Sequence, residues 1–321
     1  AIENTAVGMK ALYEDTQGDG TTAIGHKALY YQAVSDGVSG NTGVGRKAGW
    51  YNETGTNNTY LGYDAGRGVS GKSHSGCVFI GANAAQKAYT GDDNIAIGYG
   101  SMDDVDADDT VGASTSNTFI GTNAGGGTWV TAASNYNVGI GNNVMDAAMN
   151  GAVGNTSIGY ASTSALISGD NNVCLGKDVA VGLTTGNSNV IIGMNANTAS
   201  ASANRTAIGY DCQAVADNSV TLGDGDVTAV YMGDDADTGT GAIAHAYQYH
   251  AKSLAAQQAE LQLATYSDTT STFSAIRFQK SHQDTVGNTV VDDDHYLGGI
   301  FFQGNLSLIH ISEPTRQAEI S

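Results

Sequence analysis

The 321-residue chain contains a single proline and three cysteines, and only 14% of its residues are charged. Collagen is excluded, because a collagen triple helix needs glycine at every third position together with abundant proline. Three widely spaced cysteines form neither a disulfide framework nor a metal pattern. No apolar run approaches the roughly 20 residues that span a bilayer, and the first residues show no secretion signal.

Positive charge is also scarce. Thirteen Lys and Arg residues stand against 32 Asp and Glu residues, so the formal net charge is −19. A chain this acidic repels phosphate backbones and anionic lipid headgroups, and we expect neither nucleic acid nor membrane insertion. Glycine, in contrast, occurs 44 times, which is about twice its usual share.

Many of these glycines end a five-residue repeat that recurs thirteen times, at intervals of 14 to 23 residues. Such self-similarity is typical of stacked repeat architectures. The repeat glycines are Gly8, Gly25, Gly45, Gly62, Gly81, Gly98, Gly121, Gly141, Gly159, Gly176, Gly193, Gly209 and Gly223.

In each repeat, exemplified by Asn4–Gly8, we name the four residues before the glycine the lead, first, middle and last positions. The lead is Asn in nine copies, the first position is always β-branched, and the last is always Val, Ile or Leu. The middle position varies from Gly43 to Tyr60. This alternation has the period of two that is typical of a β-strand.

We expect the uniform first and last positions to face the interior and the variable middle position to face outward. Under this interpretation one interior column contains Val7, Ile24, Val44 and Leu61. Tyr60, Phe79, Phe119 and Ile191 would then point outward. An Ile192→Asp substitution is predicted to be severe, because it would bury an unpaired carboxylate.

Three further features predict how the repeats stack. Asn side chains at the lead position are expected to hydrogen-bond from turn to turn. The repeat glycine provides either a positive φ or room for close backbone approach. Three residues after it a small or apolar residue returns in twelve copies, as at Ala28, which marks a second inward position. The sequence therefore predicts an all-β fold, a β-solenoid of 17–20-residue repeats with variable polar loops.

A solenoid whose interior holds only small side chains buries little apolar area per residue. With aromatic side chains expected on its outside, it needs a partner surface. We therefore expect a parallel homotrimer. At about 4.8 Å per turn, thirteen turns give a rod roughly 60 Å long.

The repeats, for example Asn94–Gly98 and Asn155–Gly159, resemble those in the heads of trimeric autotransporter adhesins and in the shafts of bacteriophage tail fibres. The resemblance covers residues 1–233 and implies a trimeric β-roll. It implies attachment to a host cell-surface glycan or protein, from the tail of a virion or from a bacterial surface.

Residues 234–258 are expected to form a linker and a short helix, and residues 259–305 the start of a β-domain. Residues 273–304 resemble a β-domain found late in phage tail fibres and tailspikes, ahead of a self-cleaving chaperone, which favours the phage interpretation. Residues 306–321 resemble a translated sequencing adapter and are excluded from the fold. The natural protein is then expected to be longer, with this sequence a fragment.

Aspartates provide the metal candidates, since Asp104, Asp106 and Asp108 alternate as calcium ligands do. The calcium-loop pattern needs Gly and Glu where Asp109 and Thr115 stand, so no metal is expected. No cofactor motif and no catalytic histidine spacing occur, and we expect a protein without enzymatic activity.

Tyrosines on the predicted loops are the binding candidates, because their rings can stack on sugars or on protein. They are Tyr13, Tyr30, Tyr31, Tyr51 and Tyr89. Three functions remain open: a phage tail fibre, a bacterial adhesin, and a tailspike that cleaves polysaccharide with paired carboxylates.

Overall fold

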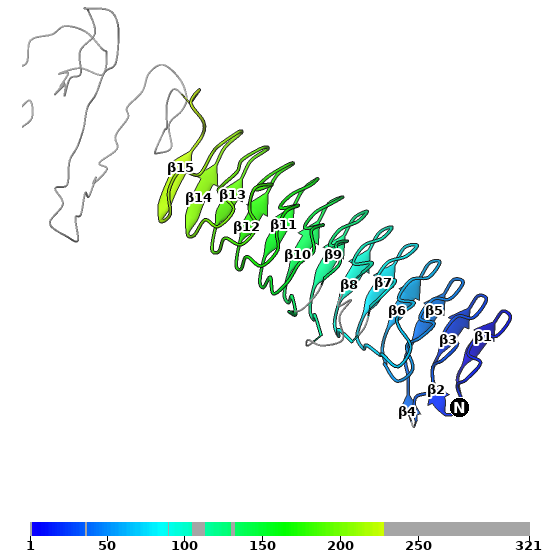
Figure 1. Cartoon of the computed structure of the whole chain (residues 1–321). Helices are drawn as coiled ribbons and strands as arrows, with labels where there is room; N and C mark the ends of the chain where they lie inside the picture. Colours follow the sequence, from blue (N-terminus) through cyan, green and yellow to red (C-terminus); the bar gives the residue numbers. More distant parts are fainter. Residues whose placement is uncertain (1, 36, 89, 105–112, 130–131, 228–321) are drawn as a thin grey trace, which may run out of the picture. The chain divides into compact units, whose positions relative to one another are not determined.

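The computed structural model describes residues 2–35, 37–88, 90–104, 113–129 and 132–227. The regular secondary structure of these residues consists of β-strands alone. Thirteen of the strands form one parallel sheet, in which they follow one another in sequence order (Figure 1). The predicted all-β fold, a parallel β-solenoid, is therefore confirmed. The predicted short helix and C-terminal β-domain, and the segment 306–321, lie outside the described residues.

Each turn of the solenoid contributes one strand of three or four residues to the sheet. The thirteen strands are β1 (Thr5–Val7), β3 (Thr22–Ile24), β5 (Thr42–Val44), β6 (Thr59–Leu61), β7 (Val78–Ile80), β8 (Ile95–Ile97), β9 (Thr118–Ile120), β10 (Val138–Ile140), β11 (Thr156–Ile158), β12 (Val173–Leu175), β13 (Val190–Ile192), β14 (Arg205–Ile208) and β15 (Ser219–Leu222). A second, two-stranded sheet pairs β2 (Gly18–Asp19) with β4 (Gly37–Val38).

The register places equivalent positions above one another. Between β11 and β12, for example, the first positions Thr156 and Val173 pair, and so do the last positions Ile158 and Leu175. Because every neighbouring pair repeats this register, each position of the repeat forms a continuous column along the solenoid.

The direction in which these columns face is the reverse of the sequence prediction. The middle residues Tyr60, Phe79, Phe119 and Ile191 are at most 1% exposed and form part of the core. The last position faces outward, where Val7 is 57% and Leu61 47% exposed. The expected interior column of Val7, Ile24, Val44 and Leu61 was therefore wrong.

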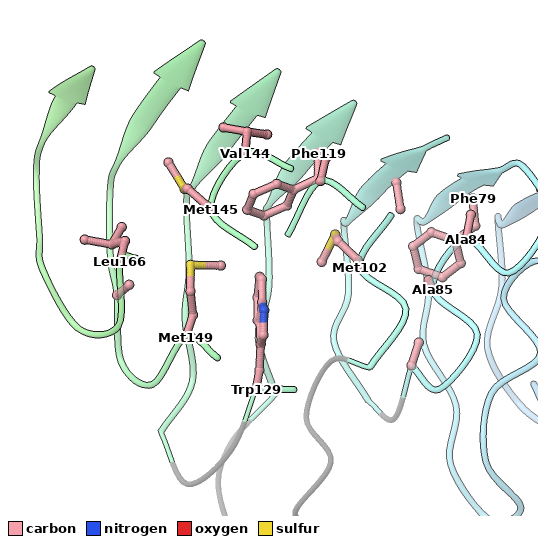
Figure 2. Packing of buried hydrophobic residues seen from close by; sticks show 14 of the residues in the cluster. Phe79, Ala84, Ala85, Met102, Phe119, Trp129, Val144, Met145, Met149 and Leu166 are labelled. Carbon is pink, nitrogen blue, oxygen red and sulfur yellow. The ribbon is translucent and has the colours of Figure 1, made fainter. Parts of the chain in front are cut away.

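The expectation of uniformly small interior side chains was also wrong, because aromatic rings fill the interior. Phe119 lies edge-to-face against Trp129, with ring centroids 5.6 Å apart (Figure 2). The neighbouring middle position is Gly139, where a Cβ would overlap the Phe119 ring. At this step a large side chain in one turn is therefore accommodated by glycine in the next, whereas Tyr60 and Phe79 on adjacent turns pack ring against ring.

The repeat glycines serve both of the roles considered for them. Twelve of the thirteen have φ between 128° and 145°, a region that side chains with a Cβ rarely adopt. At Gly159, a Cβ would also overlap the carbonyl oxygen of Gly176 on the next turn. Glycine at this corner thus permits both the chain reversal and the close stacking of turns.

The predicted asparagine ladder is confirmed. Asn155 Nδ2 donates to Asn137 Oδ1 at 2.9 Å and to the Gly169 carbonyl at 2.7 Å. Its own Oδ1 accepts from the backbone N–H and the Nδ2 of Asn172, at 3.0 and 2.9 Å. These side chains are buried, so the ladder satisfies polar backbone groups that water cannot reach.

Cys77 interrupts this ladder, because the Asn94 N–H meets a sulfur atom there in place of an amide oxygen, and sulfur is a weak acceptor. We expect Cys77→Asn to stabilise the solenoid by about 1 kcal/mol, since it adds buried hydrogen bonds of the kind made at every intact step. The midpoint of urea denaturation measures the effect. Cys174→Asn is the matched control and should destabilise, because it places the same amide at a middle position outside the ladder. A lower midpoint for Cys77→Asn would contradict the prediction.

Candidate functional site

The predicted calcium candidates are only partly described. Asp104 forms an ion pair with Lys87 at 3.2 Å and accepts a hydrogen bond from Thr128 Oγ1 at 2.9 Å, whereas Asp106 and Asp108 lie outside the described residues. Burial, and then the charge of Asp104, raises the pKa of Asp103. Within the described ranges, no three His, Cys, Asp or Glu residues gather as a metal site would require.

The three cysteines are buried free thiols. Burial raises the pKa of Cys77 to about 12 and that of Cys174 to about 11. Both thiols are therefore protonated at neutral pH, and a protonated thiol is a poor nucleophile. Lys177, which the sequence places near Cys174, forms an ion pair with Asp178 instead.

The histidines of the described part of the chain, His26 and His74, occupy different environments. His74 is buried, and its Nε2 lies 2.8 Å from the hydroxyl of Tyr60. It therefore belongs to the interior of the solenoid. His26 is half-buried at the surface, near the basic side chains of Lys27, Arg46 and Lys47.

The most distinctive surface feature lies on the turns that follow β1, β3 and β5. On each of these turns a lysine stands two residues after the repeat glycine, with φ of 57° or 58°. Aromatic residues follow five and, on two turns, six residues after the glycine. We call this set the aromatic–basic strip; it contains Lys10, Tyr13, Lys27, Tyr30, Tyr31, Lys47, Trp50 and Tyr51.

The rings of the strip stack from turn to turn. Tyr13 and Tyr30 are stacked with centroids 5.1 Å apart, and Tyr31 stacks on Tyr51 at the same separation and an interplanar angle of 7°. Trp50 stacks on Tyr51 at 4.8 Å. The aromatic rings of the strip therefore form a continuous series of contacts across three turns.

The lysines lie over these rings. The Nζ of Lys47 is 3.9 Å and that of Lys27 5.1 Å from the centroid of Trp50, and Lys10 Nζ is 5.2 Å from that of Tyr13. Cation–π attraction of this kind holds an ammonium group in place without neutralising its charge. Beside the strip, Arg46 lies over the Tyr63 ring at 5.2 Å.

The lysines of the strip differ from most other basic groups in the described residues by their partners. Within the described ranges, none of Lys10, Lys27 and Lys47 forms an ion pair with a carboxylate, whereas Lys87, Lys177 and Arg205 are each paired with an aspartate.

The positive charges of these side chains act on the neighbouring His26. Its pKa is lowered by burial first and then by the charges of Lys27, Arg46 and Lys47. Burial is also the main cause that lowers the pKa of Lys47. The strip is therefore a local concentration of positive charge on an acidic chain.

Sequence reasoning identified Tyr13, Tyr30, Tyr31 and Tyr51 as candidates and missed the lysines and Trp50. Tyr89 lies outside the described residues. The signal was present, because the lysines recur at one fixed distance from three consecutive repeat glycines. This regularity becomes visible only when the turns are aligned on their repeat glycines.

Comparison of the chain with protein-family models, with curated proteins and with solved structures finds no match. Nowhere in the described ranges is there a helix long and apolar enough to cross a membrane.

Proposed function

We propose that the chain is a homotrimeric rod, a structural and receptor-binding component of a phage tail fibre. The observation that supports assembly is the outward face of the thirteen-stranded sheet. Its last-position column consists entirely of Val, Ile and Leu, and seven of its thirteen members are exposed: Val7, Ile24, Leu61, Ile140, Ile158, Ile208 and Leu222.

An apolar column of this length is unusual on a protein that works alone. The thirteen aliphatic side chains lie about 4.8 Å apart; seven of these residues are 38–57% exposed and the other six are partly buried. Together they present on the order of several hundred Å² of apolar surface. A patch of this size is comparable with the largest patch on a typical single chain, about 300–600 Å², and such patches often mark interaction sites. The expected need for a partner surface thus remains, with the aliphatic column in place of the aromatic residues.

Other copies of this chain are the partners that fit the column best. Copies arranged in parallel around an axis along the solenoid would bring the same column together in register at every turn. Three copies are favoured by the resemblance of the repeats to two classes of trimeric protein. Burial of the column would then supply apolar contacts in addition to those of the solenoid interior.

The place of this rod in a phage tail is supported by the resemblance of residues 273–304 to a late tail-fibre domain. Loops along the rod and the C-terminal part would present the receptor-binding groups. The alternative is the head of a bacterial trimeric autotransporter adhesin, which shares the repeat. A second alternative is a tailspike that degrades polysaccharide.

Light scattering of the purified chain should give a mass three times that of the 32.8 kDa monomer. Fluorescently labelled protein should bind bacterial cells, and incubation with capsular polysaccharide should release no oligosaccharides. A stable soluble monomer would contradict the proposed assembly. Release of oligosaccharides would instead identify the tailspike enzyme, and binding to animal cells or matrix in place of bacteria would favour the adhesin.

A further inference from the structure

Charge is distributed unevenly along the chain. Residues 1–87 contain seven of the thirteen Lys and Arg residues and seven Asp and Glu residues, whereas residues 88–227 contain two basic and fourteen acidic residues. The three lysines of the aromatic–basic strip form no ion pair with a carboxylate within the described ranges, although Asp64 acts on Lys47 and Glu14 on Tyr30. Residues 1–87 are therefore neutral overall and repel a negatively charged ligand less than the following turns do, and the lysines of the strip provide local positive charge for it.

We propose that the aromatic–basic strip binds an acidic polysaccharide, whose carboxylates contact Lys10, Lys27 and Lys47 and whose hydroxyls contact the tyrosines. This inference deepens the proposed function and rests on it, since it names the class of receptor that the rod would bind and the turns that would bind it.

The periodicity of the strip fits a chain-like ligand. The lysines recur once per turn, about 4.8 Å apart along the solenoid, and each is accompanied by at least one aromatic ring. A polymer lying along the solenoid would meet the same groups at each step. A sugar chain has such a repeat, because each ring unit presents hydroxyls and, in acidic polysaccharides, carboxylates at regular intervals.

The chemistry of the exposed groups favours a sugar over other acidic partners. The strip combines the phenolic hydroxyls of four tyrosines with three ammonium groups, which suit a hydroxyl-rich ligand that also carries negative charge. A duplex nucleic acid carries a far denser negative charge, and the fourteen acidic residues of the following turns would repel it. A polysaccharide with spaced carboxylates meets less repulsion.

The repeat itself provides variants that remove the charge and keep the fold. Lys27 and Lys47 adopt a left-handed conformation, with φ of 57° and 58°. Asn occupies the equivalent position at Asn83, Asn123, Asn143 and Asn195, with φ between 53° and 59°. The double variant Lys27→Asn/Lys47→Asn therefore introduces a residue that this position already accepts elsewhere. Lys177→Asn is the matched control, because it removes a lysine outside the strip.

Binding of the full chain to immobilised polygalacturonate at low salt tests the proposal, with dextran and duplex DNA as comparison ligands. We expect binding to polygalacturonate that weakens with added salt, at least tenfold weaker binding by the double variant, and no change for Lys177→Asn. Unchanged binding by the double variant, equal binding to dextran, equal binding to DNA, or no binding to polygalacturonate would each overturn the proposal. Light scattering of the same samples reports the assembly separately, so failure of the strip and failure of the trimer are distinguishable.

Discussion

Gly159→Ala is expected to destabilise the solenoid by more than about 3 kcal/mol, since it adds steric overlap to backbone strain. Gly159 has a φ of 139°, which an alanine adopts only with strain. In addition, the new Cβ would overlap the carbonyl oxygen of Gly176. Because that oxygen belongs to the backbone of the next turn, relief would require the turns to separate and would weaken the ladder of hydrogen bonds between them.

Gly71→Ala is the control that separates the two causes. Gly71 also has a positive φ, of 77°, but a Cβ there would meet no atom within 4 Å. Backbone strain alone should cost about 1 kcal/mol. Urea denaturation followed by circular dichroism measures both variants, and equal losses at the two positions would show that close stacking of the turns is not what requires glycine.

The architecture was predictable from the sequence because it depends on features that every turn repeats. The β-branched first position, the aliphatic last position and the glycine corner together specify a short strand followed by a chain reversal. The Asn at the lead position specifies a ladder, since an amide can donate and accept along a stack of identical groups. None of these inferences needs knowledge of which side of the strand is buried.

The buried face was not predictable by the rule that uniform positions are internal. A three-residue strand has one side chain on one face and two on the other, and period alone does not say which face is inside. Here the single middle side chain is internal. At Phe119, for example, the neighbouring Gly139 leaves room for the ring. The uniform positions lie on the outer face, where a partner surface would explain why they are all apolar.

Of the aromatic–basic strip, the tyrosines were predictable from the sequence, whereas the lysines and Trp50 were not. The tyrosines are conspicuous in the sequence, whereas Lys27 and Lys47 lie twenty residues apart. They become neighbours only when the turns stack in register. A site built from one residue per turn is visible in the sequence only after the turn has been defined.

Two adjacent isoleucines test the orientation of the strand and the proposed assembly together. Ile191 is fully buried in the interior, whereas Ile192 is only partly buried, on the outer face of β13. Ile191→Asp should unfold the surrounding turns, with a loss of more than about 4 kcal/mol, because it buries an unpaired carboxylate among apolar side chains. Ile192→Asp is expected to leave the solenoid folded, which replaces the prediction made from the sequence alone.

Assembly should respond in a different way from folding. Since Ile192 belongs to the aliphatic column that would meet the other copies, its replacement by aspartate puts one like charge per copy at the shared interface. We expect Ile192→Asp to keep the circular dichroism spectrum of the solenoid and to show the mass of a monomer by light scattering. An Ile192→Asp protein that stays trimeric would place the interface on another face. If Ile191→Asp were the better tolerated of the two, the middle position would not be internal, and the orientation of the whole sheet would have to be reversed.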